Sequence, residues 1–395
     1  MLMLAGLGHL LPVGLAIGLA LLTAQGLVWR FGPPPPMGRY LPIDGLRGLL
    51  AFSVMLHHAV IWYDYARTGQ WVLPASHVFA ELGQGSVLLF FMITSFLFVG
   101  KIADGRQPVD WFRLYVSRVL RLTPLYWLAV AAMLTVVGVL SGWVLREPLR
   151  QLLGEVSVWL AYTVSGYPDV NRIANTSQIV ADVTWTLVYE WLFYLFLPVL
   201  AWLMGRRPAW RTLAFSVLAL WWMLANWHPN LRMLMVFVLG GLTATVVLRR
   251  QALVRFAASR AAAWLALALL LTVLLVFPSA YATGPTLLLW GLFILIACGN
   301  TLFGVLVHPA TRMLGEMAYS VYLLHGLSLY LLFHGVVGES VLRSWTPLHF
   351  WLVLLAAVPA MVLLSFMTWA WVERSGMRAV APLLGWLRRQ PPVQG

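Results

Sequence analysis

Residues 348–372 read LHFWLVLLAAVPAMVLLSFMTWAWV, a run without a single Lys, Arg, Asp or Glu. A helix of this length can cross a hydrocarbon core of about 30 Å. Apolar runs of similar length recur along the chain, and 61% of its 395 residues are hydrophobic while only 10% are charged. Because so few ionisable groups cannot cover a globular surface of this size, the sequence predicts an all-α, polytopic transmembrane helical bundle.

Gly, Pro and charged residues divide the apolar sequence into ten core spans, preceded by one extra N-terminal helix. The extra helix, Leu4 to Trp29, is expected as a retained anchor or as a helix that lies against the bundle. The segment 151–163 is apolar but short and interrupted by Glu155, which is typical of an interfacial or re-entrant helix. The ten spans are expected near 46–62, 82–100, 122–142, 185–204, 212–227, 231–248, 261–277, 285–306, 317–335 and 348–372.

The formal net charge of +13 is explained by the distribution of basic residues between the spans. If alternate connections are cytoplasmic, 20 of the 26 Lys and Arg lie on that side. This imbalance predicts an outside amino terminus and an inside carboxyl terminus, with the lipid bilayer as the main partner and no nucleic acid. Cys298 is the single cysteine, so a disulfide framework and a thiol-rich metal site are excluded, and we expect no metal.

The stretch Asp44-Gly45-Leu46-Arg47-Gly48 opens a span that also carries His57 and His58. Arg47 and His58 are eleven residues apart, which in a helix places them nearly on one face and about 16 Å apart. A neutral imidazole near the middle of the membrane is suited to take a proton from a hydroxyl. The alternative is a core histidine bonded to a neighbouring helix. His57 points about 100° away and is expected to be structural.

The spacing Arg118-x-x-Arg121 ends a stretch of five basic residues that begins at Lys101. Two guanidinium groups one helical turn apart can hold phosphates in bidentate fashion. The alternative is that these residues mark the cytoplasmic side or bind anionic lipid head groups.

Further ionisable groups lie inside the expected spans, where an unpaired charge is costly. Glu190 lies a turn and a half into its span, and could orient His58, neutralise an arginine, bind a sugar hydroxyl or form a structural ion pair. Tyr322 and His325 are one turn apart, so both can face one cavity, or both can be core residues. At the end of the last span, Glu373-Arg374 is expected to form an ion pair at the membrane interface.

Together these residues resemble the acyltransferase-3 family, integral membrane acyltransferases that O-acylate bacterial surface and secreted glycans. The resemblance covers about residues 40–378. Its matching pieces are Asp44 to Gly48 with His58, Phe90 to Leu97, Arg118-x-x-Arg121 with Pro124 and Tyr126, Trp185 to Tyr194, Tyr319 to His325, and Val372-Glu373-Arg374. The chain departs from the family pattern at Thr94-Ser95 in place of Ser-Gly, at Thr186 in place of serine, and at Ser375 in place of proline.

The resemblance implies roles for individual residues. Arg47 and His58 correspond to the pair associated with catalysis, and Arg118 and Arg121, with Arg47, to the acyl-CoA donor site. We expect Glu190 to act with the catalytic pair. Residues expected to hold the acceptor or support the site are Asp44, Trp185, Tyr194, Tyr322 and His325.

On this basis the sequence predicts three regions: an anchor helix with a Pro-rich linker (1–38), an acyltransferase-3-like membrane domain (39–378) and a cytoplasmic tail (379–395). The expected reaction moves an acetyl group from cytoplasmic acetyl-CoA to a glycan or lipid-linked saccharide, at the bacterial inner membrane, with His58 as general base. The alternatives are transfer from succinyl-CoA, a non-glycan acceptor, a secondary transporter of a polar or anionic substrate, and a lipid-binding scaffold without chemistry.

Overall fold

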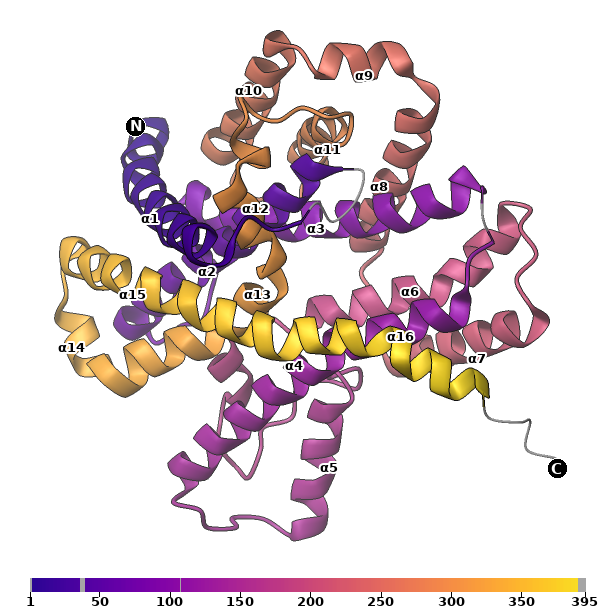
Figure 1. Ribbon diagram of the computed structural model, residues 1–395. Coiled ribbons are helices and arrows are strands. Elements are labelled where there is room, and N and C mark those ends of the chain that lie inside the picture. The colour runs from indigo at the N-terminus through magenta and orange to yellow at the C-terminus, as the bar shows by residue number, and fades with distance from the viewer. Residues whose placement is uncertain (1, 36–39, 107, 390–395) are drawn as a thin grey trace.

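The computed structural model describes residues 2–35, 40–106 and 108–389, and within these ranges it is built from helices without a named strand (Figure 1). The first half of the chain forms α1 (Leu2–Phe31), α2 (Leu41–Thr68), α3 (His77–Asp104), α4 (Trp111–Ser141), α5 (Leu149–Leu160), α6 (Trp185–Leu203) and α7 (Trp210–Asn226). The second half forms α8 (Leu231–Arg249), α9 (Gln251–Ala257), α10 (Arg260–Val276), α11 (Thr283–Ala297), α12 (Pro309–Glu316), α13 (Ala318–Tyr330), α14 (Glu339–Ser344), α15 (Pro347–Thr368) and α16 (Arg374–Arg389).

The helical bundle predicted from the sequence is confirmed. Eight of the described helices are long and apolar enough to cross a membrane, and the bent pair α9 and α10, with 79° between its parts, would form a ninth. Two shorter helices, α7 with 17 residues and α11 with 15, occupy the remaining expected positions. Each of the ten expected core spans and the N-terminal helix therefore coincides with a helix, and the protein is a multi-pass membrane protein.

The expected boundaries of one span are wrong. The span expected at 285–306 ends as a helix at Ala297, because the backbone N–H of Asn300 bonds to the carbonyl of Leu295 and that of Gly299 to Ile296. This pair of bonds is a Schellman motif, which terminates helices. The chain then continues through turns and the short 3₁₀ segment Val305–Val307.

The segment expected to be interfacial forms α5, a helix of 12 residues. At 1.5 Å per residue its length is about 18 Å, too short to cross a hydrocarbon core. Figure 1 shows α4 and α5 as a hairpin that projects from the rest of the bundle, while α16 runs across the front of it. Among the candidate spans, α2 is the most enclosed, because it packs against α3, α12 and α13.

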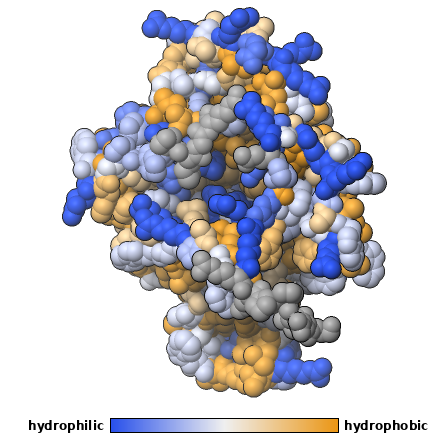
Figure 2. Space-filling view, turned by 45° about the vertical axis from the view of Figure 1, so that its right-hand side comes forward, coloured by the Kyte–Doolittle hydropathy of each residue, from blue (hydrophilic) through white to orange (hydrophobic). Residues whose placement is uncertain are grey.

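The ends of the membrane domain are partly described. Pro36 of the Pro-rich linker and Arg39, the expected start of the domain, lie outside the described residues, as do residues 390–395 of the expected tail. Within the described part, residues 379–389 continue α16, an amphipathic helix packed along α4. Figure 2 shows hydrophilic residues around a hollow on one face of the molecule, between large hydrophobic areas.

The ion pair expected between Glu373 and Arg374 is wrong. The five residues Trp369–Glu373 form a π-helical turn between α15 and α16. This turn carries Glu373 into the core, where it is 1% exposed and accepts a short hydrogen bond from the Ser320 hydroxyl. Arg374 instead lies over the Trp369 ring, 5.4 Å from its centroid. Wider turns of this kind re-aim side chains and are frequent at functional sites.

Candidate active site

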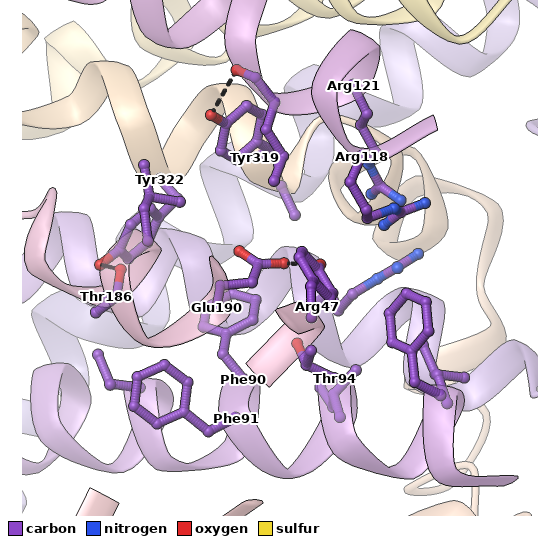
Figure 3. A pocket seen from close by; sticks show the side chains of 18 of the residues that line it. Arg47, Phe90, Phe91, Thr94, Arg118, Arg121, Thr186, Glu190, Tyr319 and Tyr322 are labelled. Carbon is purple, nitrogen blue, oxygen red and sulfur yellow. Dashed lines mark hydrogen bonds between the residues drawn. The ribbon is translucent and has the colours of Figure 1, made fainter. Parts of the chain in front are cut away.

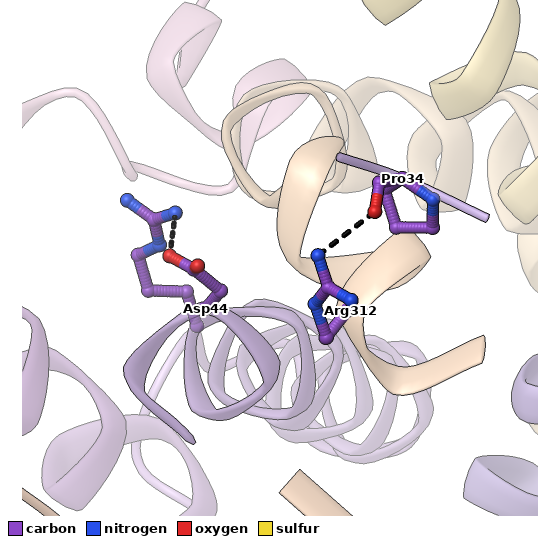
Figure 4. Close-up of polar contacts among 4 residues, drawn as sticks. Pro34, Asp44 and Arg312 are labelled. Atoms are coloured by element: carbon purple, nitrogen blue, oxygen red, sulfur yellow. Dashed lines mark hydrogen bonds and ion pairs between the residues drawn. The ribbon is translucent and has the colours of Figure 1, made fainter. Parts of the chain in front are cut away.

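The amino-terminal turns of α2 hold the first expected site residues against α12. A side chain at Gly315 of α12 would meet the Asp44 carbonyl oxygen at 1.9 Å, so the two helix backbones are in direct contact. Asp44 pairs with Arg47 at 2.9 Å, and nearby Arg312 donates to the Pro34 carbonyl oxygen at 2.8 Å (Figure 4). The Asp44 carboxylate therefore anchors the Arg47 guanidinium.

Inside the bundle, a cavity of about 140 Å³ is lined by residues from α2, α3, α4, α6, α12 and α13. Figure 3 shows Arg118 and Arg121 toward one end, Glu190 in the middle, and Thr186 with Tyr322 at the opposite end. Arg47 also lines this cavity, so α2 and α4 bring three guanidinium groups to one space. The walls between are largely apolar and include Phe90 and Phe91.

The arginine end of the cavity has unsatisfied hydrogen-bond donors. Among the described residues, the Nε atoms of Arg47 and Arg118 are buried and have no hydrogen-bond partner. The Arg118 guanidinium lies over the rings of Phe98 and Tyr194, at 5.4 and 5.8 Å from their centroids. Because buried donors in proteins are normally paired, these groups fit an anionic ligand such as a phosphate.

Glu190 is held by a residue of its own helix. Its carboxylate accepts a short hydrogen bond from the Tyr194 hydroxyl, one turn further along α6. Both residues line the cavity, and Tyr194 in turn lies beneath Arg118. Thus Glu190 adds negative charge close to the arginines without an ion pair of its own among the described residues.

At the far end of the cavity, the hydroxyls of Thr186 and Tyr322 lie 2.7 Å apart. Both also reach the Val183 carbonyl oxygen, at 3.2 Å from Thr186 and 3.1 Å from Tyr322. Two hydroxyl hydrogens can satisfy this group of three oxygens, one bond to the carbonyl and one between the hydroxyls. This arrangement links α6 and α13 where the cavity ends.

His58 and His325 contact one another beyond Tyr322, whose ring centroid is 6.0 Å from that of His325. The Nδ1 atom of His325 lies 3.2 Å from the Val321 carbonyl oxygen, and Nδ1 of His58 lies 3.0 Å from that of Val54. A carbonyl oxygen only accepts, so both Nδ1 atoms must carry hydrogen. The His58 Nδ1–H is then shared with the unprotonated Nε2 of His325, 3.1 Å away.

This pattern defines the chemistry of His58. With its proton on Nδ1, the neutral ring presents an unprotonated Nε2, the form required of a base. The residue is deep in the bundle but not fully enclosed, unlike His57 and His325, which are 6% and 3% exposed. His57 uses Nδ1 to bond the Phe79 carbonyl oxygen at 2.7 Å, the kind of contact expected of a structural histidine.

The structure separates some of the expected site residues. Arg47 and His58 share α2, yet Arg47 lines the cavity and His58 is not among its lining residues. Trp185 does not line the cavity either; its ring packs against Phe91 and Tyr189, at centroid distances of 6.2 and 5.7 Å. Asp44 contributes through Arg47.

Two polar residues at or near the site were given no separate role by the sequence. Tyr319 lines the cavity and donates to the Leu122 carbonyl oxygen at 2.9 Å. Glu81, 2% exposed, has no hydrogen-bond partner for either carboxylate oxygen among the described residues. Glu81 was missed because the expected span began at residue 82, whereas α3 begins at His77.

The fold and this cavity define a class: a multi-pass helical membrane protein whose bundle holds a cavity with apolar walls and a cluster of arginines. A family model described as an acyltransferase domain, that of the acyltransferase-3 family, matches residues 41–370. Since this match covers most of the chain, the protein belongs to the acyltransferase-3 family and is a membrane acyltransferase, as its sequence motifs predicted.

One curated relative is Nodulation protein 10 of Rhizobium leguminosarum bv. viciae. It is 27% identical over 202 residues, which are 47% of this chain and 51% of that protein, so the match spans about half of each. No solved structure matches the chain. Family membership favours the acyltransferase prediction over the secondary transporter and the lipid-binding scaffold.

Proposed function

We propose that this protein transfers an acetyl group from cytoplasmic acetyl-CoA to a hydroxyl of an exported or surface glycan, or of its lipid-linked precursor. One observation carries the proposal: a single cavity has three arginines toward one end and, at the other, Tyr322, whose ring contacts His325, the hydrogen-bond partner of His58. In the proposed function the anionic donor binds at the arginines, and His58, reached beyond His325, is the base for the acceptor.

The donor is proposed to lie with its phosphates at Arg47, Arg118 and Arg121. Guanidinium groups bind phosphate oxygens bidentately and keep their charge at every physiological pH. The apolar walls near Phe90 and Phe91 suit the thioester arm. Glu190 bonds the Tyr194 hydroxyl, and the Tyr194 ring lies against Arg118. In the proposal these contacts keep the Arg118 guanidinium at the wall of the cavity. In this arrangement the acetyl group is the part of the donor that advances toward Thr186 and Tyr322.

In the proposed transfer, Nε2 of His58 takes the proton of the acceptor hydroxyl while the oxygen forms a bond to the thioester carbonyl carbon. The carbon–sulfur bond then breaks, and the sulfur leaves with the electron pair. The imidazolium returns the proton to that sulfur, so the products are the acetyl ester and the free CoA thiol. Both the His58 ring and its partner His325 end in their starting state.

The proposed location is the bacterial inner membrane, with the amino terminus outside and the carboxyl terminus inside. In this orientation α2 and α4 begin on the cytoplasmic side, which puts Arg47, Arg118 and Arg121 nearest to the CoA pool. The acceptor then approaches from the outer side. Transfer passes through the bundle, so neither substrate has to cross the bilayer whole.

The experiment is transfer of label from radiolabelled acetyl-CoA by the purified protein in vesicles, with a mixed saccharide extract as acceptor. Succinyl-CoA and small non-glycan alcohols are offered in parallel. Ester-bound label on saccharide supports the proposal. Label that moves only from succinyl-CoA, or only to a non-glycan alcohol, would replace the donor or the acceptor named here, and no transfer from any acyl-CoA would contradict the donor class.

A further inference from the structure

The hydroxyl pair of Thr186 and Tyr322 lies between the arginine-lined cavity and the two histidines. Both residues line the cavity, and they are 7% and 8% exposed. The Tyr322 ring also contacts His325, with 6.0 Å between the two ring centroids, and His325 in turn contacts His58. A group that moves from the arginines toward His58 therefore meets this pair first.

The pair is held in a rigid frame. A side chain at Gly326, one turn after Tyr322 on α13, would meet the Val180 carbonyl carbon at 2.4 Å, so α13 lies directly on the backbone that leads into α6. The Phe90 ring backs Tyr322 in an edge-on contact with a centroid distance of 5.9 Å. The shared bonds to the Val183 carbonyl oxygen fix the two hydroxyls. Side chains fixed in this way discriminate between ligands of different size, because displacing them costs free energy.

We propose that Thr186 and Tyr322 form the acyl-length filter of this enzyme, which admits an acetyl group and excludes longer chains. The inference rests on the proposed function, in which the acyl end of the donor advances away from the arginines. The γ-methyl of Thr186 narrows the passage, and the hydrogen bond to Tyr322 keeps that methyl in place.

The expected size of the effect follows from how well apolar sites distinguish one methylene. Such sites discriminate by about 10- to 200-fold. The filter therefore predicts that acetyl-CoA exceeds butyryl-CoA in kcat/KM by at least about 100-fold, since two methylenes are added. Removal of the Thr186 methyl should lower this ratio by about 10-fold or more.

The test uses variants that separate size from hydrogen bonding. Thr186→Ser removes the methyl and keeps the hydroxyl, Thr186→Val keeps the size and removes the hydroxyl, and Tyr322→Phe removes the partner hydroxyl. Thr243→Ser is the matched control, because Thr243 is fully buried on α8 and does not line the cavity. Acetyl-, propionyl- and butyryl-CoA are compared by kcat/KM for each protein.

The proposal expects Thr186→Ser, which loses the methyl, to raise transfer of the longer chains relative to acetyl the most. Thr186→Val and Tyr322→Phe each lose the hydrogen bond that holds the methyl and should raise it less, while Thr243→Ser keeps the wild-type ratio. Unchanged ratios in active Thr186→Ser and Tyr322→Phe would overturn the filter and leave the proposed function standing. A wild-type protein that transfers no acyl group from any of the three donors overturns both. Thermal stabilisation by acetyl-CoA and butyryl-CoA is the second measurement; it needs no acceptor, and equal stabilisation of wild type by both donors also contradicts the filter.

Discussion

His58 and His325 are 267 positions apart in sequence, yet Nδ1 of one ring lies 3.1 Å from Nε2 of the other. The contact joins α2 to α13 and uses the proton that His58 also shares with the Val54 carbonyl oxygen. His325 accepts from His58 as the carboxylate does from the histidine in many hydrolytic triads, and together with the Val54 carbonyl it holds the ring in the Nδ1–H tautomer. In the proposed mechanism His325 is a positioning residue, because it acts through His58.

The histidine pair leads to a prediction about kcat and about KM for acetyl-CoA. His58→Ala should lower kcat by about 100- to 10,000-fold, the usual contribution of a positioned base. His325→Ala should lower kcat less and leave KM for acetyl-CoA unchanged, since it loosens the base without touching the donor site. His334→Ala, at a half-exposed position bonded to Glu339, is the control. Wild-type kcat in His58→Ala would rule out this residue as the base.

The arginine cluster predicts that arginine substitutions raise KM for a donor with phosphates and not for a donor without them. Loss of a hydrogen bond to a charged group costs about 1.5–3 kcal/mol, or about 10- to 150-fold in affinity. Arg118→Ala and Arg121→Ala should each raise KM for acetyl-CoA by about this factor and leave that for acetyl-pantetheine nearly unchanged. Arg113→Ala is the matched control, because Arg113 is exposed on the same helix. An equal change for both donors would mean that these arginines do not bind phosphate.

The close packing of α16 against α4 predicts how a Gly→Ala substitution on α16 changes stability. A side chain at Gly376 would meet the Leu120 carbonyl oxygen at 2.1 Å, whereas one at Gly385 meets nothing within 4 Å. Gly376→Ala should destabilise by about 1–3 kcal/mol through overpacking. Gly385→Ala, on the same helix, should be neutral or stabilising by up to about 1 kcal/mol. Thermal unfolding in detergent measures both, and equal midpoints would argue against the tight α4–α16 contact.

The start of α4 predicts a pH-dependent contribution to stability. Asp110 caps the helix by accepting from the Arg113 backbone N–H at 3.0 Å and pairs with Arg388 at 2.5 Å. The hydrogen bond from Arg113, with a smaller contribution from Arg388, lowers the pKa of Asp110 from its ordinary value of 3.8. A lowered folded-state pKa means that the stabilisation is present above the unfolded pKa and is lost as the pH falls through the folded one.

Asp110→Ala should therefore cost about 1 kcal/mol at neutral pH, and the difference from wild type should shrink below pH 3.8. Asp110→Asn keeps a capping oxygen and should lose less, with little dependence on pH. Arg388→Ala should cost less than about 1 kcal/mol, because this ion pair is exposed. A penalty for Asp110→Ala that is constant from neutral to acid pH contradicts the assignment.

The proposed orientation predicts which side of the membrane labels which residue. Cys298 is the single cysteine and is buried, so Cys298→Ala gives a background without thiols. An impermeant maleimide should label Arg172→Cys in intact spheroplasts and Arg207→Cys only after permeabilisation; both positions are exposed. The reverse pattern would invert the topology and put the arginine end of the cavity outside.

The sequence was sufficient to predict the spans and the N-terminal and interfacial helices, but not their exact ends or the additional helices α9, α12, α14 and α16. Long apolar runs identify helices such as α3 and α15 because their burial in lipid needs no detail of packing. The end of α11 depends on two backbone bonds at Gly299 and Asn300, which hydropathy does not reveal. The inward turn of Glu373 depends likewise on a local π-helical turn, and an end-of-helix charge pair is otherwise the simpler expectation.

For the candidate site, the residue types were predictable and their grouping was not. Arg47, Arg118 and Arg121 were selected for their spacing along single helices, and the structure brings them to one cavity because α13 packs against both α2 and α4. Spacing on one helix also placed Arg47 and His58 about 16 Å apart, too far to act on the same atom. The partner of His58 comes from another helix, which no local pattern identifies.

The closed Thr186–Tyr322 pair has an electrical consequence. Any continuous water-filled path through a membrane protein would let protons run down the membrane potential, at about 2.3 kcal/mol per charge for each 100 mV. In the structure, two buried hydroxyls bonded to each other and to a carbonyl fill the end of the cavity where open water would otherwise continue toward the histidines. In the proposed reaction a chemical group would pass from one aqueous phase to the other, while the bundle keeps bulk water from following it.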